Sequence, residues 1–198
     1  MASISEDKLT LVREMYNTQN MSMQDIATKL NVSLDSVVYF MRKHKINRRN
    51  TSDTNRYKYT LQTPSFSLNS DTTNEKLLII LAMLYWAEGY KTEKANGLDF
   101  ANSDPDMIKT FITALRSVYC LDEGRLRVLL YCYQDQNVKD LISFWSCHTC
   151  IPEAQFTKPY IRKDIKDGGR KMPYGLIHIR YYDKKLLIEL KKLIESYK

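Results

Sequence analysis

The sequence LLIILAMLYWAEG, residues Leu77–Gly89, decides the fold of the larger part of this chain. Its residues are apolar almost without interruption, so we expect a helix over residues 74–88 that is buried on several sides. The apolar run covers eleven residues, 77–87, whereas a membrane-spanning helix needs about 20. The segment therefore predicts a core helix in a protein with no membrane partner.

A carboxylate ends this apolar run. Glu88 is followed by Gly89, at a position where helices commonly stop. A carboxylate at a helix C-terminus faces the negative end of the helix dipole, which costs about 0.3–1 kcal/mol. A bound divalent metal would remove this cost, and so would solvent or a cation such as Lys91 or Lys94. From the residues alone, these alternatives stay open.

The chain after this helix alternates between strand and helix signals. Pro105 marks one helix start, because proline is favoured in the first helical turn. The patterns predict strands at 97–102, 125–133, 156–163 and 176–182, and helices at 106–120, 138–150 and 184–197. This mixed order predicts the α+β fold class.

The stretch before the helix has a different composition. Asn, Thr, Ser, Arg and Tyr dominate residues 47–73, and Pro64 interrupts them. Such residues favour turns and loops over regular structure. We therefore predict a linker at residues 51–73, with a short strand near 57–61.

Residues 1–50 carry the pattern of three short helices. The first helix has an apolar stripe of Leu9, Val12 and Tyr16. The sequence SMQDIATKLNVS (Ser22–Ser33) then opens with a Ser-x-x-acid capping box. Asn31 suits a tight turn, since asparagine tolerates the left-handed conformation. Ser33 is placed to cap a third helix, whose predicted inner face is Val37, Val38 and Met41.

This pattern resembles the helix-turn-helix of resolvases and many bacterial regulators, in which the second helix of the pair enters the DNA major groove. The resemblance implies that the outer face of the third helix contacts DNA and that a basic arm follows it. The predicted DNA-binding residues are Ser33, Asp35, Ser36, Tyr39, Arg42, Lys43, Arg48 and Arg49. The alternative is a three-helix bundle that binds protein.

The charge of the chain also favours a polyanionic partner. The net charge is +7, and residues 42–58 hold seven Lys or Arg against one acid, Asp53. Such a cluster is typical of nucleic-acid binding, although a solvated surface carries similar runs. The N-terminus has no basic and apolar leader pattern, so we expect a cytoplasmic, DNA-associated protein.

The four cysteines give no clear chemistry. Cys147 and Cys150 have the C-x-x-C spacing, but a structural zinc site needs a second ligand pair, which the sequence lacks. We interpret these thiols as buried or idle, and their role stays open.

Part of the apolar helix has a recognisable motif. LAMLYWAEG (Leu81–Gly89) lines up with the nine-residue motif of the LAGLIDADG homing endonucleases, with an acid conserved as an acid at Glu88. The identical positions are Leu81, Ala82, Leu84, Ala87 and Gly89. The resemblance extends over about residues 74–198 and implies a mixed α/β domain with an antiparallel sheet.

The resemblance also implies a site. In that family two motif helices pack together, and their terminal carboxylates hold divalent metals that hydrolyse phosphodiester bonds. It assigns Glu88 as metal ligand and catalytic residue, Asn102 as a polar residue that orients water, and Lys158 as a basic active-site residue. One chain carries one motif, so Mg²⁺-dependent cleavage of double-stranded DNA requires a homodimer.

Three functions follow from these observations. The first is a metal-dependent DNA endonuclease, which the carboxylate of Glu88 favours. The second is a non-cleaving transcription regulator on the same scaffold, which the compact predicted sheet favours. The third is an RNA-binding or maturase-like protein, which the basic, Tyr-rich composition permits. In each, residues 1–50 form the helix-turn-helix domain and 74–198 the endonuclease-like domain.

Overall fold

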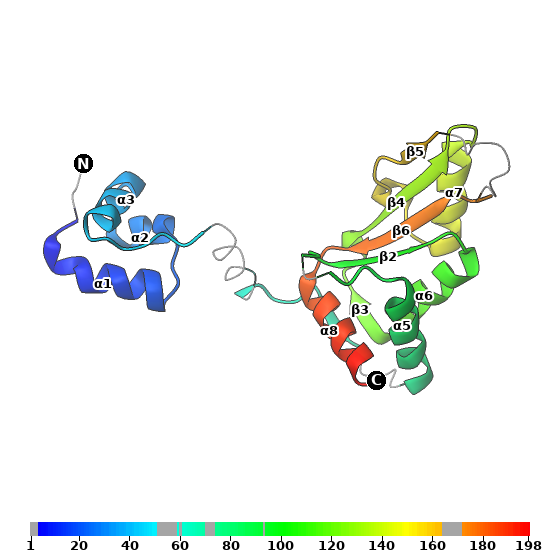
Figure 1. The fold of residues 1–198 in the computed structure, drawn as a ribbon, viewed down its shortest axis with the longest axis horizontal. Helices are drawn as coiled ribbons and strands as arrows, with labels where there is room; N and C mark the ends of the chain where they lie inside the picture. The colour runs from blue at the N-terminus through cyan, green and yellow to red at the C-terminus, as the bar shows by residue number, and fades with distance from the viewer. Residues whose placement is uncertain (1–3, 51–58, 60, 70–73, 93, 164–171) are drawn as a thin grey trace. The chain divides into compact units, whose positions relative to one another are not determined.

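A computed structural model describes residues 4–50, 59, 61–69, 74–92, 94–163 and 172–198 (Figure 1). The chain divides into two compact units, Met1–Thr63 and Pro64–Lys198. The first is helical and the second mixes strands and helices, which confirms the predicted α+β class. Among the residues described, no helix is long and apolar enough to cross a membrane.

The first unit packs short helices around one small core. These are α1 (Leu9–Arg13), which continues into a π-helical turn (Glu14–Thr18), then α2 (Met23–Leu30) and α3 (Leu34–Lys43). A π-helical turn inserts one residue into the helical register. The neighbours Met15 and Tyr16 are accordingly both buried.

The sequence signals around α2 and α3 are confirmed in detail. Ser22 Oγ accepts a hydrogen bond from Asp25 N (3.1 Å), and Ser22 N donates to Asp25 Oδ2 (3.0 Å), which completes the capping box. Asn31 ends α2 in the left-handed conformation, with φ at 53°. Ser33 Oγ caps α3 by accepting from Ser36 N (3.2 Å). Two helices therefore meet at the predicted tight turn.

The predicted inner face of α3 needs one correction. Val37 and Met41 are buried as expected, but Phe40 is buried in the place predicted for Val38, which is only half-buried. Helical neighbours on one face are three or four residues apart. Phe40 and Met41 therefore share the face of Val37, whereas Val38 lies to its side.

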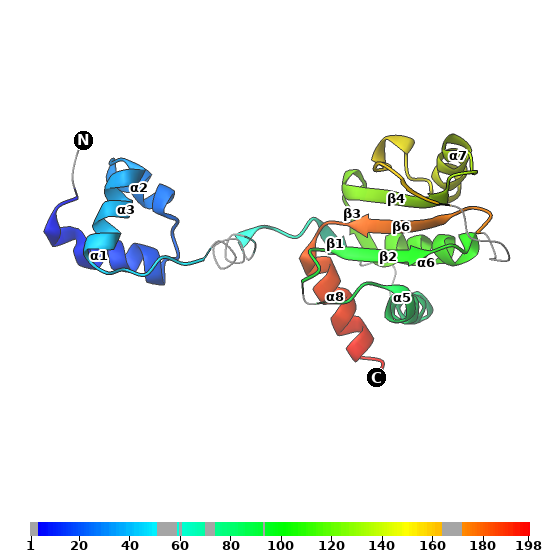
Figure 2. The same ribbon diagram turned by 45° about the horizontal axis from the view of Figure 1, so that its top comes forward.

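A four-stranded sheet forms the centre of the second unit. Its order is β2 (Leu98–Asn102), β6 (Leu176–Tyr181), β4 (Leu126–Tyr133) and β5 (Tyr160–Arg162). Figure 2 shows β6 between β2 and β4, and both pairs are antiparallel.

The prediction of an antiparallel sheet is wrong for the fourth strand, β5. β5 pairs with β4 in parallel, because the chain returns through α7 (Val138–Thr149) before it rejoins the sheet. Such a crossover is the connection that parallel neighbours require. The strand predicted over 156–163 is also shorter, because Phe156 makes only an isolated bridge with Val128 and regular pairing begins at Tyr160.

The helices cover one face of this sheet. α5 (Glu75–Glu88), α6 (Pro105–Val118), α7 and α8 (Lys184–Glu195) share one core with alternate strand residues. The rings of Phe100 and Phe111 stack at its centre, 3.8 Å apart. The side chains at the intervening strand positions point away from this core, onto the open face of the sheet.

A small second sheet binds part of the predicted linker to this unit. β1 (Phe66–Leu68) pairs antiparallel with β3 (Tyr119–Leu121). Ser65, the residue before β1, donates from its N (2.9 Å) and its Oγ (2.7 Å) to the buried carboxylate of Asp183. The short strand predicted near 57–61 falls mainly outside the described residues.

The end of α5 depends on close packing at Gly89. Its φ is −77°, so it does not adopt the left-handed conformation. A β-carbon added there would lie 2.5 Å from ring atoms of the buried Tyr85 and from its carbonyl oxygen. Burial raises the pKa of Tyr85, and its hydroxyl donates to Tyr90 O (3.0 Å). Tyr85 thereby fixes the turn that follows α5.

We predict that Gly89→Ala destabilises the second unit by about 1–3 kcal/mol, because overpacking forces the Tyr85 ring or the backbone to move. Urea unfolding followed by tryptophan fluorescence measures this unit alone, since Trp86 and Trp145 are the only tryptophans. The matched control is Gly124→Ala, whose β-carbon would meet only the Asp122 side chain at 3.3 Å. Equal stability of the two variants would contradict the packing argument.

Candidate functional site

Glu88 lies at a surface pocket of about 410 Å³ between the end of α5 and the open face of the sheet. The chain after α5 runs beside β2, where Tyr90 N donates to Asp99 O (2.8 Å) and Gly89 forms a bridge with Phe100. The residues that line the pocket are Glu88, Gly89, Tyr90, Asp99, Ala101, His178 and Arg180.

Lys91 binds carbonyl groups at the end of α5 and makes no ion pair with the Glu88 carboxylate. Its ammonium group donates to the carbonyl oxygens of Trp86 (2.7 Å) and Gly89 (2.7 Å). Burial lowers the pKa of Lys91, although the charge of Glu88 opposes this shift. Within the described part of the chain, Glu88 makes no hydrogen bond or ion pair, and its side chain is exposed. This carboxylate is therefore accessible to a ligand.

Asp99 is the second carboxylate of the pocket, and it is already paired. It lies 2.7 Å from His178 Nδ1 through Oδ1, and accepts from Arg180 Nε (2.9 Å) through Oδ2. Partial burial alone would raise the pKa of Asp99, but these two partners hold it below its usual value. Asp99 is therefore ionised at neutral pH, with both oxygens occupied.

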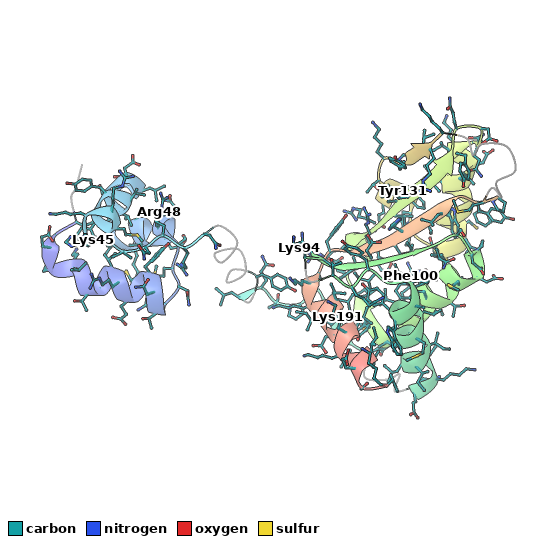
Figure 3. All side chains as sticks on the ribbon, in the orientation of Figure 1. Lys45, Arg48, Lys94, Phe100, Tyr131 and Lys191 are labelled. Atoms are coloured by element: carbon teal, nitrogen blue, oxygen red, sulfur yellow. The ribbon has the colours of Figure 1, made fainter. Side chains whose placement is uncertain are left out.

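The open face of the sheet carries both cations and neighbouring aromatic rings. The strand register sets Arg180 between Asp99 and Arg127, and His178 between Ala101 and Leu129. The ring of Tyr131, labelled in Figure 3, lies 5.0 Å from those of His178 and Tyr160, with the Arg162 guanidinium 5.4 Å above it. Basic and aromatic side chains together are typical of surfaces that bind nucleic acid.

The other two residues predicted for the Glu88 site lie elsewhere. Asn102 is on the helix-facing side of β2, where its Oδ1 accepts from Asp104 N (2.8 Å) and its amide lies 3.0 Å from Met107 Sδ. Lys158 is exposed next to Thr157, whose N donates to Val128 O (2.8 Å) at the edge of β4. Neither lines the Glu88 pocket.

Asp99, His178 and Arg180 were not identified from the sequence as site residues. The signal that could have found them is the alternation of each strand, in which they face away from the buried Phe100 and Ile179. A polar residue between two buried ones must point to the other side of the sheet.

The outer face of α3 carries part of the predicted DNA-binding set. Asp35, Tyr39 and Arg42 are spaced by four and three residues, so they form one exposed stripe, and Tyr39 is 68% exposed. The two serines of the set are half-buried, and Ser33 Oγ lies 2.8 Å from Ser36 Oγ.

Two predicted cations of the first unit have partners inside it. Lys43 pairs with Glu6. Arg49 donates to Asn20 Oδ1 (2.7 Å) and Met21 O (2.6 Å), and its guanidinium lies 4.3 Å from the centre of the Tyr16 ring. Arg48 is exposed, as is Lys45 (both labelled in Figure 3). Arg49 therefore fastens the basic arm to the helices, while Arg48 stays accessible.

We predict that Arg49→Gln destabilises the first unit by about 1–3 kcal/mol, because buried hydrogen bonds from a charged group are lost. Hydrogen exchange measured by mass spectrometry should show faster exchange of the amides of Met15–Met21. Arg48→Gln removes the same charge from an exposed side chain and should leave these rates unchanged. Similar exchange in both variants would show that the Arg49 contacts do not hold the arm.

Comparison with known protein families, with curated proteins and with solved structures finds no match for this chain. In the part of the chain that the structure describes, no group of three or more His, Cys, Asp or Glu side chains is placed to hold a metal ion. Cys147 and Cys150 are free and exposed.

Proposed function

We propose that this chain is a sequence-specific DNA-binding protein that acts as a homodimer and hydrolyses phosphodiester bonds with a divalent metal. One observation carries the proposal. α5 is apolar on all sides, keeps Ile79 and Trp86 exposed, and ends in Glu88, whose carboxylate makes no hydrogen bond or ion pair with the residues that the structure describes.

The exposed side of α5 supports the homodimer. Leu81, Ala82 and Tyr85 face the core, whereas Ile79 is 39% exposed and Trp86 is 44% exposed. Large apolar side chains gathered on one exposed face are typical of a protein interface. A second copy has the same apolar stripe, so a twofold axis along α5 would cover both stripes. Such an axis would place both Glu88 carboxylates at the same end of the helix pair.

The metal requires this second copy. Asp99 has both oxygens occupied, so one chain offers only Glu88 in the pocket, which does not fit a divalent cation. Two copies would supply two Glu88 carboxylates, and carboxylate oxygens suit Mg²⁺. A metal bound there would activate water and stabilise the leaving oxygen. The basic and aromatic face of the sheet would hold the DNA backbone beside it.

The first unit would supply the sequence preference. Its α2 and α3 meet at a tight turn, as in a helix-turn-helix, and the stripe of Asp35, Tyr39 and Arg42 is accessible to base edges. Lys45 and Arg48 lie exposed after α3, where they would contact phosphates.

The test is cleavage of a randomised plasmid library by the purified full chain with Mg²⁺. We expect discrete cuts that disappear with EDTA and in Glu88→Gln, because the metal loses its ligand. Glu75→Gln is the matched control, since Glu75 is an exposed carboxylate at the opposite end of α5. Cuts that persist in Glu88→Gln would refute the role of this carboxylate.

A specific observation favours a second function, a transcription regulator that binds DNA without cutting it. Asp99 is paired with His178 and Arg180, so among the described residues Glu88 is the one pocket carboxylate without a hydrogen bond or ion pair. Tight, salt-sensitive DNA binding by the wild type, with no cuts under any metal, would support the regulator.

A further inference from the structure

The pairing of Asp99 with His178 sets which imidazole nitrogen faces the carboxylate. An ionised carboxylate is only an acceptor, so at the 2.7 Å contact His178 Nδ1 is the donor. Nε2 is then the ring nitrogen that remains for another partner. Among the residues that the structure describes, no side chain or carbonyl makes a hydrogen bond to Nε2. A carboxylate that holds one imidazole nitrogen in this way orients the other nitrogen for proton transfer.

The position of His178 brings its imidazole to the Glu88 pocket. Both residues line the pocket, and the Tyr90–Asp99 backbone hydrogen bond of 2.8 Å fixes the end of α5 beside the strand that carries Asp99. The side chains of Asp99 and His178 are 21% and 22% exposed, so solvent and substrate reach them.

Arg180 adds a fixed positive charge to the same pocket. Its Nε is used by Asp99 and the side chain also hydrogen-bonds Tyr182, and the remaining N–H groups of the guanidinium are suited to a phosphate. Burial opposes the charge of this guanidinium, but Asp99 and Tyr182 raise the pKa of Arg180 above its usual value. Arg180 therefore stays cationic in the pocket.

The other groups around His178 come from three elements. Glu88 faces the pocket from the end of α5, and Tyr131 on β4 places its ring 5.0 Å from the imidazole. Arg127 on β4 lies opposite Arg180, and the Arg162 guanidinium of β5 lies over Tyr131. The imidazole therefore lies among both carboxylates and guanidiniums.

We infer that His178 is a catalytic proton acceptor for phosphodiester hydrolysis, that Asp99 is its positioning residue, and that Arg180 contacts the scissile phosphate; this rests on the proposed function. His178 Nε2 takes a proton from water as the water oxygen bonds to phosphorus. The phosphorus–oxygen bond to one nucleoside breaks, and the departing oxygen keeps the electron pair and is protonated by solvent. Asp99 stabilises the imidazolium until it returns its proton to solvent.

The alternative is that Asp99, His178 and Arg180 only link β2 to β6 and have no part in catalysis. Partly exposed ion pairs of this kind contribute little to stability. A structural pair would leave the pH dependence of cleavage unchanged when His178 is replaced. The pH dependence of cleavage in a His178 variant therefore distinguishes the catalytic role from the structural one.

The test is the rate of plasmid cleavage by the full chain with Mg²⁺ between pH 5.5 and 8.5. In the wild type the rate should rise as an imidazole loses its proton and then level off. We expect His178→Ala to lower the plateau rate by about 10²–10⁴-fold and to abolish this rise. Added imidazole should restore part of the rate, which repair of a structural contact would not do.

Two further variants keep the outcome interpretable. His148→Ala is the matched control, because His148 is half-buried on α7 and bound to Pro105 O at 2.8 Å, away from the pocket. His178→Gln preserves a hydrogen bond to Asp99 and should lose the pH-dependent rise even if His178→Ala unfolds. Tryptophan fluorescence confirms that each variant is folded.

The failures of the two proposals are distinguishable. Cleavage that depends on Glu88 and keeps its rate and pH profile in His178→Gln would overturn the role of His178 alone. A wild type that binds DNA and never cuts would overturn both. Cleavage that loses its pH-dependent rise only in the His178 variants supports the inference.

Discussion

The contact between Tyr85 and Gly89 is the constraint on which the candidate site depends. The buried ring occupies the space next to the glycine, so α5 ends there and the chain turns directly onto β2. The hydroxyl of Tyr85 then holds Tyr90 O, and Lys91 takes up the last helix carbonyls. Because Lys91 binds these carbonyl groups, Glu88 stays exposed at the pocket and forms no ion pair with the described residues.

α5 differs from the other long helices of its unit in what it leaves uncovered. α6 and α8 bury an apolar stripe and present mainly polar side chains outward, with Ile188 of α8 as an exposed exception, which is the ordinary arrangement of a surface helix. α5 buries Leu81, Ala82 and Tyr85 yet keeps Ile79 and Trp86 exposed. Apolar area left in water weakens the driving force for folding, at about 25 cal/mol per Å². A second copy is the simplest partner for such a self-complementary face.

Local signals predicted local structure well, whereas contacts between distant residues were not predicted. The caps at Ser22 and Ser33 and the turn at Asn31 depend on neighbours within four residues, and sequence shows these directly. β5 joined its sheet in parallel because of a crossover, which strand patterns do not reveal. The pairing of Asp99 with His178 spans 79 residues of sequence, so alternation placed them on a face but not beside each other. The predicted DNA contact of Arg49 has the same cause, because its partner Tyr16 is 33 residues away and sequence does not show that they meet.

The measurement that tests this account most directly is the oligomeric state of the full chain by sedimentation equilibrium. Ile79→Lys places a charge on the exposed side of α5, and Ile188→Lys makes the same change on α8, where the isoleucine is 40% exposed against 39% for Ile79. The account predicts dimers for the wild type and Ile188→Lys, and a monomer for Ile79→Lys. A wild type that stays monomeric at all concentrations, or an Ile79→Lys variant as dimeric as the control, would contradict it.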